Sequence, residues 1–147
     1  PFFGPCLQWI PGARFFAMNL KREPLPPAPQ PVNLQDKFGR FSDYWSPKIV
    51  GELNGQQVKL VKFQGEFVWH KHDNEDELFL VVNGRFRIEF RERHVWLSEG
   101  EFLIVPRGVE HRPVAEEEVH VLLFEPASTL NTGNVQDDRT VANLDRI

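Results

Sequence analysis

Cysteine, long hydrophobic runs and an excess of positive charge are all missing, or nearly so, from this 147-residue chain. The one thiol, Cys6, excludes an internal disulfide and a thiolate-rich metal site, and it favours a reducing cytoplasm. No apolar stretch approaches membrane-spanning length. The net charge of −4 leaves no electrostatic footprint for nucleic acid. These absences predict a cytoplasmic protein whose partner is a small molecule, neither nucleic acid nor a membrane.

Methionine is equally scarce, and its one occurrence, Met18, predicts where natural translation begins. Residues 1–17 are then a leader, which lacks the basic segment and continuous apolar core of a secretory signal. Proline follows at five positions, which are Pro24, Pro26, Pro27, Pro29 and Pro31. Because proline fixes its own φ and restricts the residue before it, these positions predict an extended arm. We interpret residues 1–31 as leader and arm, the arm being a linker or a strap across a neighbouring subunit.

Residues 32–126 carry the pattern of one β-rich domain with enough volume for a hydrophobic core. Asn33 predicts the start of a short helix, with the apolar positions Leu34, Phe38 and Phe41 on one side. After Pro47 the short apolar runs and closely spaced turn residues favour a closed β-barrel or jelly roll. Two hairpin turns are predicted, at Asn54–Gly55 and Asn83–Gly84. We interpret residues 127–147 as a surface tail with a helix near Thr140–Arg146.

Three histidines and one glutamate stand in two segments delimited by glycine and proline, at His70, His72, Glu77 and His111. Residues two apart on a strand point to one face, so His70 and His72 can meet a single ion. Glu77 opens an apolar run, where a carboxylate is costly to bury unless a cation or another partner neutralises it. The four residues form a ligand set for one divalent transition metal ion. The alternative is a chance coincidence of surface and turn residues.

The spacing of these residues resembles the two sequence motifs of the cupin superfamily. The first motif is matched by Gly65, His70, His72, Glu77 and Gly84. The second is matched by Gly100, Pro106, Gly108 and His111. It departs at its last position, where Ala115 replaces an asparagine that is not a metal ligand in the family. The resemblance covers residues 46–125 and implies an all-β, double-stranded β-helix (a jelly-roll barrel) that binds one metal ion.

Strand alternation predicts which neighbours face that ion. The side chains expected to line a pocket are Val68, Phe79, Val81, Phe102 and Ile104. Glu66 has the same phase as Val68 and is the candidate general base. Such apolar walls suit a small apolar ligand or dioxygen better than a sugar, unless these side chains simply fill a narrow barrel. Arg107, in the turn before His111, either guides an anionic substrate or caps the turn.

The opposite side chains predict a covered outer face. They are Phe67, Trp69, Leu78, Leu80, Val82, Leu103 and Val105. Together they would expose more apolar area than a monomer usually does. A second sheet, the short helix or another subunit has to cover them, and the cupin resemblance favours a homodimer.

The coordination of the metal ion indicates which classes of function are possible. Three neutral imidazoles and one carboxylate leave two adjacent positions of an octahedron free, so a substrate and dioxygen can bind side by side. Iron, manganese, nickel, cobalt, copper and zinc all suit mixed nitrogen and oxygen ligands. We favour a metal-dependent oxidoreductase, dioxygenase-like, acting on a small organic molecule. A sugar or keto-acid isomerase or lyase and a non-catalytic small-molecule-binding protein are the alternatives.

Overall fold

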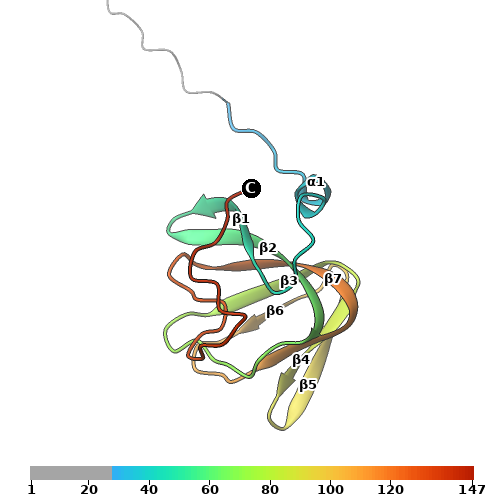
Figure 1. Cartoon of the computed structure of the whole chain (residues 1–147), viewed down its shortest axis with the longest axis vertical. Helices are drawn as coiled ribbons and strands as arrows, with labels where there is room; N and C mark the ends of the chain where they lie inside the picture. Colours follow the sequence, from blue (N-terminus) through green and yellow to red (C-terminus); the bar gives the residue numbers. More distant parts are fainter. Residues whose placement is uncertain (1–27) are drawn as a thin grey trace, which may run out of the picture. The chain divides into compact units, whose positions relative to one another are not determined.

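The computed structural model describes residues 28–147. The chain divides into two units, residues 1–30 and 31–147, and the second contains every helix and strand described (Figure 1). The predicted start at Met18 and most of the proline-rich arm lie outside the described residues. The extended prediction for the arm is therefore neither confirmed nor contradicted there.

The one described helix, α1 (Leu34–Phe38), begins where the sequence predicts it. The Asn33 side chain accepts a hydrogen bond from the backbone N–H of Asp36, which satisfies one of the free donors at the helix start. Phe38 is buried and stacks on His120, with ring centroids 4.3 Å apart. This stacking fastens the helix to the barrel, so His120 has a packing role outside the metal site.

Seven antiparallel strands build the rest of the unit. They are β1 (Lys48–Leu53), β2 (Gln56–Glu66), β3 (Glu77–Asn83), β4 (Arg85–Phe90), β5 (Arg93–Ser98), β6 (Phe102–Val105) and β7 (Arg112–Pro126). The main order is β1-β2-β7-β3-β6, and β4 joins β7 to β5. Because β7 pairs with β2 along its length, with β4 near its start and with β3 near its end, it curves through both layers (Figure 1). The all-β, jelly-roll prediction is confirmed.

The two predicted hairpin turns have different outcomes. Asn54 and Gly55 both have positive φ, 50° and 78°, and join the paired strands β1 and β2 as predicted. The hairpin at Asn83–Gly84 is wrong, because β3 pairs with β6 and β7 whereas β4 pairs with β5 and β7. A Cβ on Gly84 would lie 3.3 Å from the carbonyl oxygen of Glu118. Glycine there permits a close backbone crossing between layers rather than a two-residue hairpin.

The interior of the barrel is a continuous aliphatic and aromatic core. Its members are Val61, Phe63, Phe79, Val81, Phe86, Ile88, Leu97, Val105, Ala115, Val119, Val121 and Leu123. The prediction that Phe79 and Val81 point inward is confirmed, since each is 1% exposed.

The prediction of which β6 side chains point into the barrel is wrong. Phe102 and Ile104, expected to line the pocket, are 62% and 51% exposed. Val105 pairs directly with Glu77 across the β3–β6 ladder, and directly opposed residues share one face of a sheet. Val105 is accordingly buried, and Leu103 shares its face. The turn between β6 and His111 interrupts the alternation of inward and outward side chains. The inward orientation of His111 therefore does not predict which side chains of β6 point inward.

The prediction of which side chains just before His70 point inward is wrong as well. The ladder shifts register between Phe63 and Gly65, and β2 ends at Glu66. Glu66 is exposed, and its carboxylate accepts a hydrogen bond from Arg112 at 2.7 Å, so it is no interior base. Val68 is half-buried, and Phe67 takes the interior position. The bulge and the loop that follows reset the alternation.

The C-terminal segment packs against the barrel, and the helix predicted near Thr140–Arg146 does not form. The last residues bond to β1 instead, because the carbonyl of Asp145 accepts from the N–H of Ile49 and Arg146 forms an isolated parallel bridge with Ile49. Near the end, the N–H of Ile147 donates to the carbonyl of Ile49 on β1. The tail is thus held by specific bonds beside β1 and β2 (Figure 1).

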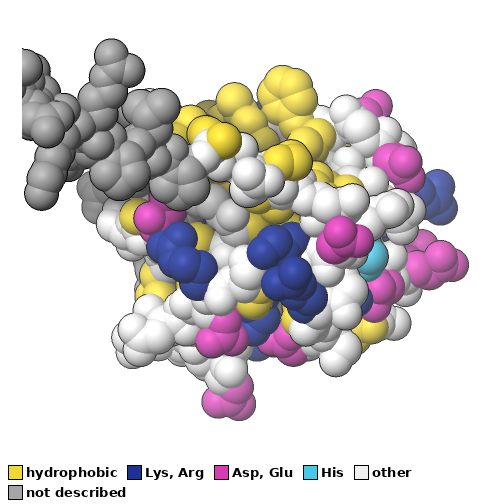
Figure 2. Space-filling model, turned by 90° about the horizontal axis from the view of Figure 1, so that it is seen from above, with side chains coloured by type: hydrophobic (Ala, Val, Ile, Leu, Met, Phe, Trp, Pro, Cys, Tyr) yellow, Lys and Arg dark blue, Asp and Glu magenta, His cyan; other side chains and the backbone are white. Residues whose placement is uncertain are grey.

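Two rows of apolar side chains cross the outer face of the sheet from β2 through β7 and β3 to β6. Cross-strand pairing gives the rows as Leu60–Leu122–Leu80–Phe102 and Val58–Phe124–Leu78–Ile104. At the β2 end Leu60 is fully buried, whereas both residues at the β6 end are exposed. Figure 2 shows hydrophobic side chains gathered along one side of the surface, with charged side chains spread over the rest.

Across the described residues, no helix is both long and apolar enough to cross a bilayer.

Candidate metal centre

The four predicted ligands come from three places in the barrel that the fold brings together. His70 forms an isolated antiparallel bridge with His111, and each backbone N–H donates to the other's carbonyl, at 3.0 and 2.9 Å. The bridge sets their rings side by side, with centroids 4.4 Å apart. His72 follows two residues later, and Glu77 is the first residue of β3. The loop after β2, the start of β3 and the start of β7 therefore meet at one end of the barrel.

All four side chains are buried, and one ligand atom from each lies within 4.8 Å of all the others. The predicted grouping of His70, His72, Glu77 and His111 is therefore present, and these residues could hold a metal ion.

Two of the imidazoles are oriented by their own backbone neighbourhoods. The Nδ1 atoms of His70 and His111 each lie 3.0 Å from a carbonyl oxygen, of Val68 and Val109 respectively. Because a carbonyl oxygen only accepts, this contact assigns a hydrogen to Nδ1 and leaves Nε2 with its lone pair free. Metal-binding histidines are typically held in this way by a carbonyl or carboxylate on the second nitrogen.

The atoms at the centre of the cluster have no hydrogen-bond partners in the described chain. They are Nε2 of His72, Nε2 of His111 and Oε2 of Glu77, all fully buried. The two nitrogens lie 3.1 and 3.5 Å from Glu77 Oε2 but are not aligned with it as hydrogen bonds. Buried polar atoms without partners are rare and need an explanation. Converging lone pairs of this kind fit a cation, so the residues present suit a divalent metal.

The electrostatics of the cluster leave most of it ready to accept a cation. Burial, and then the neighbouring His111, lower the pKa of His70 to about 4, so this imidazole is neutral near pH 7. Burial alone would raise the pKa of Glu77, but His111 and His72 outweigh it and hold that pKa at about 2. Burial opposes protonation of His72 too, yet the contact with Glu77 raises its pKa above the ordinary value. His72 therefore binds a proton more readily than His70 does.

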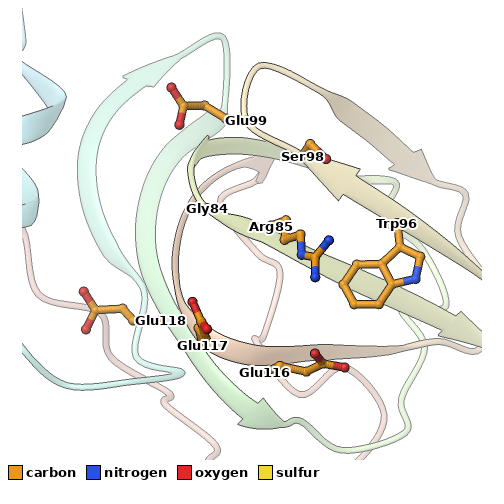
Figure 3. A pocket seen from close by; sticks show the side chains of 8 residues that line it. All are labelled: Gly84, Arg85, Trp96, Ser98, Glu99, Glu116, Glu117 and Glu118. Atoms are coloured by element: carbon orange, nitrogen blue, oxygen red, sulfur yellow. The ribbon is translucent and has the colours of Figure 1, made fainter.

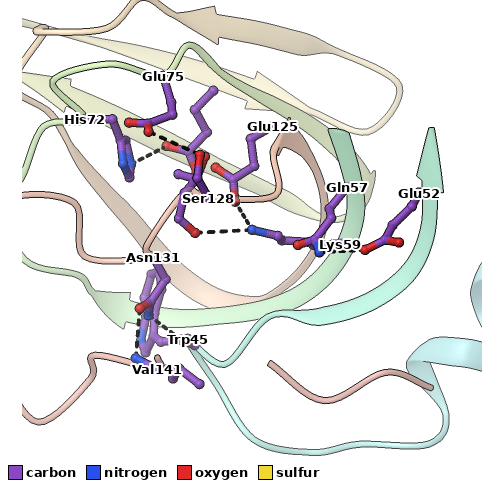
Figure 4. A network of polar contacts seen from close by, with 12 residues as sticks. Trp45, Glu52, Gln57, Lys59, His72, Glu75, Glu125, Ser128, Asn131 and Val141 are labelled. Atoms are coloured by element: carbon purple, nitrogen blue, oxygen red, sulfur yellow. Dashed lines mark hydrogen bonds and ion pairs between the residues drawn. The ribbon is translucent and has the colours of Figure 1, made fainter. Parts of the chain in front are cut away.

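A second buried polar group lies beside the cluster and escaped prediction from the sequence. Lys59 of β2 donates to Glu125 of β7 at 2.8 Å, and both side chains are at most 2% exposed. Figure 4 shows this pair in the same part of the barrel as His72. Lys59 keeps the inward phase of Val61, so the same alternation used for the pocket would have revealed a charge inside the barrel.

A small cavity adjoins the cluster. Its walls are mostly apolar and consist of Trp45, Pro47, Val61, Phe63, Phe67, His70, Glu77, Phe79, Pro113, Leu123 and Asn131. Its volume of about 20 Å³ holds about one water molecule. Trp45 stacks on Phe63 and Phe67, with centroids 4.4 and 4.8 Å apart, and closes one side. Of the predicted lining residues, Phe79 is in the wall, while Val68, Val81, Phe102 and Ile104 are not among these wall residues.

Arg107 lies exposed in the turn before His111. Its backbone N–H donates to Asp76 at 2.9 Å, which fastens the turn to the loop that follows His72. Its proposed use in guiding an anionic substrate stays a prediction.

A larger hollow of about 400 Å³ opens on the surface, with no histidine among its lining residues (Figure 3). It is lined by Gly84, Arg85, Trp96, Ser98, Glu99, Glu116, Glu117 and Glu118. The guanidinium of Arg85 lies over the Trp96 ring, 5.1 Å from its centroid. The carboxylates are exposed to water, so they resemble a solvated strand surface more than a cation site.

Comparisons with known proteins agree with this geometry. Residues 58–125 match the Cupin domain family. The structure is similar to a cupin-2 domain containing protein from Shewanella frigidimarina, with a TM-score of 0.64 and 46% identity over 65% of this chain and 93% of that one. Protein NMB1881 from Neisseria meningitidis gives a TM-score of 0.62 and 31% identity over 67% of this chain and 100% of that one.

A curated relative extends the likeness. The Bacillus subtilis protein YdbB is 38% identical over 80 residues, which are 54% of this chain and 65% of YdbB, slightly under two thirds of its length. Hydroquinone 1,2-dioxygenase PnpCD, whose structure contains Cd²⁺ and 4-hydroxybenzonitrile, is 17% identical with a TM-score of 0.54, a likeness of fold alone. From the matched domain, the jelly-roll barrel and the buried histidine–glutamate cluster, we conclude that the chain belongs to the cupin superfamily.

Proposed function

We propose that the chain binds one divalent transition metal ion through His70, His72, Glu77 and His111. The observation that carries this proposal is the set of buried lone pairs that converge without hydrogen-bond partners. A carboxylate with a pKa of about 2 and a neutral His70 supply the ligand forms that such an ion requires. Iron, manganese, nickel, cobalt, copper and zinc all suit these nitrogen and oxygen donors.

The reaction class that we propose is a metal-dependent, dioxygenase-like oxidation of a small organic molecule. When bound, the ion would supply Lewis acidity and a meeting point for two reactants. The chain contributes the surroundings: Phe63, Phe67 and Phe79 form apolar walls, and His70 and Glu77 reach the cavity between them. Such walls favour an apolar molecule, and they offer few of the polar groups that an isomerase or lyase acting on a sugar needs.

A non-catalytic metal-binding role is the second candidate, and the size of the cavity favours it. A volume of about 20 Å³ admits water or a diatomic gas but no organic substrate, so catalysis requires movement of the wall. Trp45 is the wall residue whose backbone is strained, with a φ of 60°, which few residues other than glycine adopt. Displacement of the Trp45 segment is therefore the movement that separates the two candidates.

Metal analysis of protein purified without chelator or nickel affinity resin tests the binding proposal. We expect one transition metal ion per chain, and none after joint replacement of the four ligands by alanine. Equal metal content in the two proteins would overturn the proposal.

Oxygen uptake then tests the reaction class. After anaerobic reconstitution with iron(II), we expect metal-dependent oxygen consumption with at least one member of a panel of catechols, thiols and diketones. Full metal loading without consumption on any member would favour the non-catalytic candidate.

We also propose that the chain forms a homodimer through the β3–β6 end of its outer sheet face. Phe102 and Ile104 end two apolar rows that are exposed at their β6 end, whereas at the β2 end Leu60 is buried and Val58 is half-buried. An apolar surface that continues a buried one is typical of a protein interface. A second copy, with the same exposed rows, is a self-complementary partner for it.

Light scattering at micromolar concentration tests the dimer. We expect twice the chain mass for the unmodified protein and a single chain mass after the double substitution Phe102→Glu and Ile104→Glu. A single chain mass for the unmodified protein would contradict the proposal.

A further inference from the structure

The backbone of Lys71, the residue between the first two metal-site histidines, is held by a residue from the distant C-terminal segment. The Lys71 N–H donates to Oδ1 of Asn134 at 2.9 Å. In return, the backbone N–H of Asn134 donates to the carbonyl oxygen of Lys71 at 3.1 Å. Asn134 thus satisfies both backbone polar groups of Lys71, the residue that joins His70 to His72.

Gly133 makes this approach possible. Its φ is 53°, and a Cβ at this position would overlap the carbonyl oxygen of Lys71. The same Cβ would lie 3.3 Å from Nδ1 of His72. The chain therefore presses its bare backbone against the peptide between the two histidines and against the second imidazole, which only glycine allows without displacement.

The loop that carries His72 has few other anchors. Residues 71–76 belong to no strand, and the carbonyl of His72 accepts from Gly108 at 2.6 Å. His70 and His111 each have an Nδ1–carbonyl bond that orients the ring, whereas the described residues provide no such bond for His72. The ring of His72 depends on the position of its backbone and on the contact with Gly133.

We propose that Gly133 and Asn134 form a clamp that positions His72 relative to His70 for metal binding. The proposal rests on the proposed metal site and names residues that act through the ligands. The clamp lies outside residues 58–125, the part of the chain that matches the family. The C-terminal segment accordingly completes the metal centre of the barrel. Outer contacts of this type commonly change metal affinity by about 10- to 100-fold.

Cobalt(II) is the probe for this proposal, since its visible absorption reports the arrangement of its ligands. Asn134 is exposed, so its replacement leaves no buried cavity. We expect Asn134→Ala to weaken cobalt(II) binding about tenfold and to change the spectrum of the cobalt-saturated protein. Asn134→Asp keeps an oxygen that accepts from the Lys71 N–H, and it should restore both the affinity and the spectrum.

The controls separate positioning from general stability. Asn143→Ala alters an exposed asparagine of the same segment and should change neither measurement. Gly133→Ala alters the other residue of the clamp, because the added Cβ would overlap the backbone of Lys71. It should reproduce the effect of Asn134→Ala. If Asn134→Ala lowers only the unfolding midpoint of the metal-free protein, with cobalt affinity and spectrum unchanged, the clamp is refuted. If the unmodified protein binds no cobalt(II), the metal-site proposal itself fails.

Discussion

Two carboxylates are buried at the same end of the barrel, and the chain treats them differently. Glu125 has its cation built in, because the ammonium group of Lys59 lies 2.8 Å away. The imidazole nitrogens nearest to Glu77, Nε2 of His72 and Nε2 of His111, make no aligned hydrogen bond with it. Glu125 thus has a cationic partner within the polypeptide, on Oε1, although its Oε2 has no hydrogen-bond partner among the described residues. The cluster around Glu77 has more hydrogen-bond acceptors than donors. We infer that a bound metal ion supplies the positive charge that the polypeptide does not provide there.

The pKa values of the two carboxylates also differ, in opposite directions from the ordinary value. Burial, and then repulsion from Glu77, raise the pKa of Glu125 to about 7, although Lys59 acts in the opposite direction. Burial would also raise the pKa of Glu77, but the two imidazoles beside it hold that pKa at about 2. Glu77 therefore stays ionised through the physiological range, as a metal ligand must, whereas Glu125 sits near its point of protonation.

The sharpest way to break the comparison is to neutralise each carboxylate in turn. We expect Glu77→Gln to lower metal affinity by more than about 100-fold, beyond the usual range for outer contacts, because a direct ligand is lost. Glu125→Gln should leave one metal ion per chain. Inductively coupled plasma measurements on matched, dialysed samples decide the point. Equal metal loss in both variants would show that the two carboxylates form one site.

The second prediction concerns the built-in cation. Lys59→Met leaves Glu125 buried without its partner, and breaking such a pair usually costs about 3–5 kcal/mol. Urea unfolding of the metal-free protein at pH 8 should show a loss of this size. The double variant Lys59→Met with Glu125→Gln should recover much of it, because no charge is then stranded.

The pH dependence of that loss has a definite sign. Glu125 already has a raised pKa when folded, and losing Lys59 removes a contribution that lowers it. A carboxylate with a folded pKa above its unfolded value binds more protons when folded, so stability falls as pH rises between those values. The destabilisation of Lys59→Met should therefore be smaller at pH 5 than at pH 8. A loss independent of pH would exclude Glu125 as its cause.

Features that are set by the spacing of a few neighbouring residues were predictable from the sequence. The Asn33 cap and the Asn54–Gly55 turn depend on a few neighbouring positions. The metal-site residues depend on motif spacing, which remains visible even though the bridge joining His70 to His111 is long-range. In each case a short pattern has one well-populated structural outcome.

Features that depend on register or on distant contacts were not predictable. Alternation placed Glu66 and Phe102 inside, but a bulge before the first and the pairing of β6 with β3 reverse those assignments. The Asn83–Gly84 pair fits a hairpin locally, although the strands on either side bond to other partners. Asn134 could not be linked to Lys71 at all, because 63 residues separate them and no motif joins them.

The third prediction uses the proton that competes with the metal at His72. Burial opposes that proton, but Glu77 raises the pKa of His72 above its ordinary value of 6.5. An imidazole must be neutral to bind a metal, so affinity should fall as pH drops through this raised pKa. Below this pKa, one competing proton lowers the affinity about tenfold per pH unit. Cobalt(II) titrations between pH 5.5 and 8.5 test the slope, and a flat profile would contradict the assignment.

The smallest expected effect concerns the influence of one carboxylate on the other. The negative charge of Glu77 helps to raise the pKa of Glu125 to about 7, second only to burial. Replacing Glu77 by Gln removes that charge, and the pKa of Glu125 should fall while its contact with Lys59 persists. Titration of the Glu125 carboxyl carbon by ¹³C NMR, in metal-free protein, measures the change, with Glu66→Gln as an exposed control. An unchanged pKa would mean that the two carboxylates are electrostatically separate, and that burial and Lys59 alone set the charge of Glu125. A fall in the pKa would mean that charge placed at the metal site is felt by Glu125, the neighbour that carries its own cation.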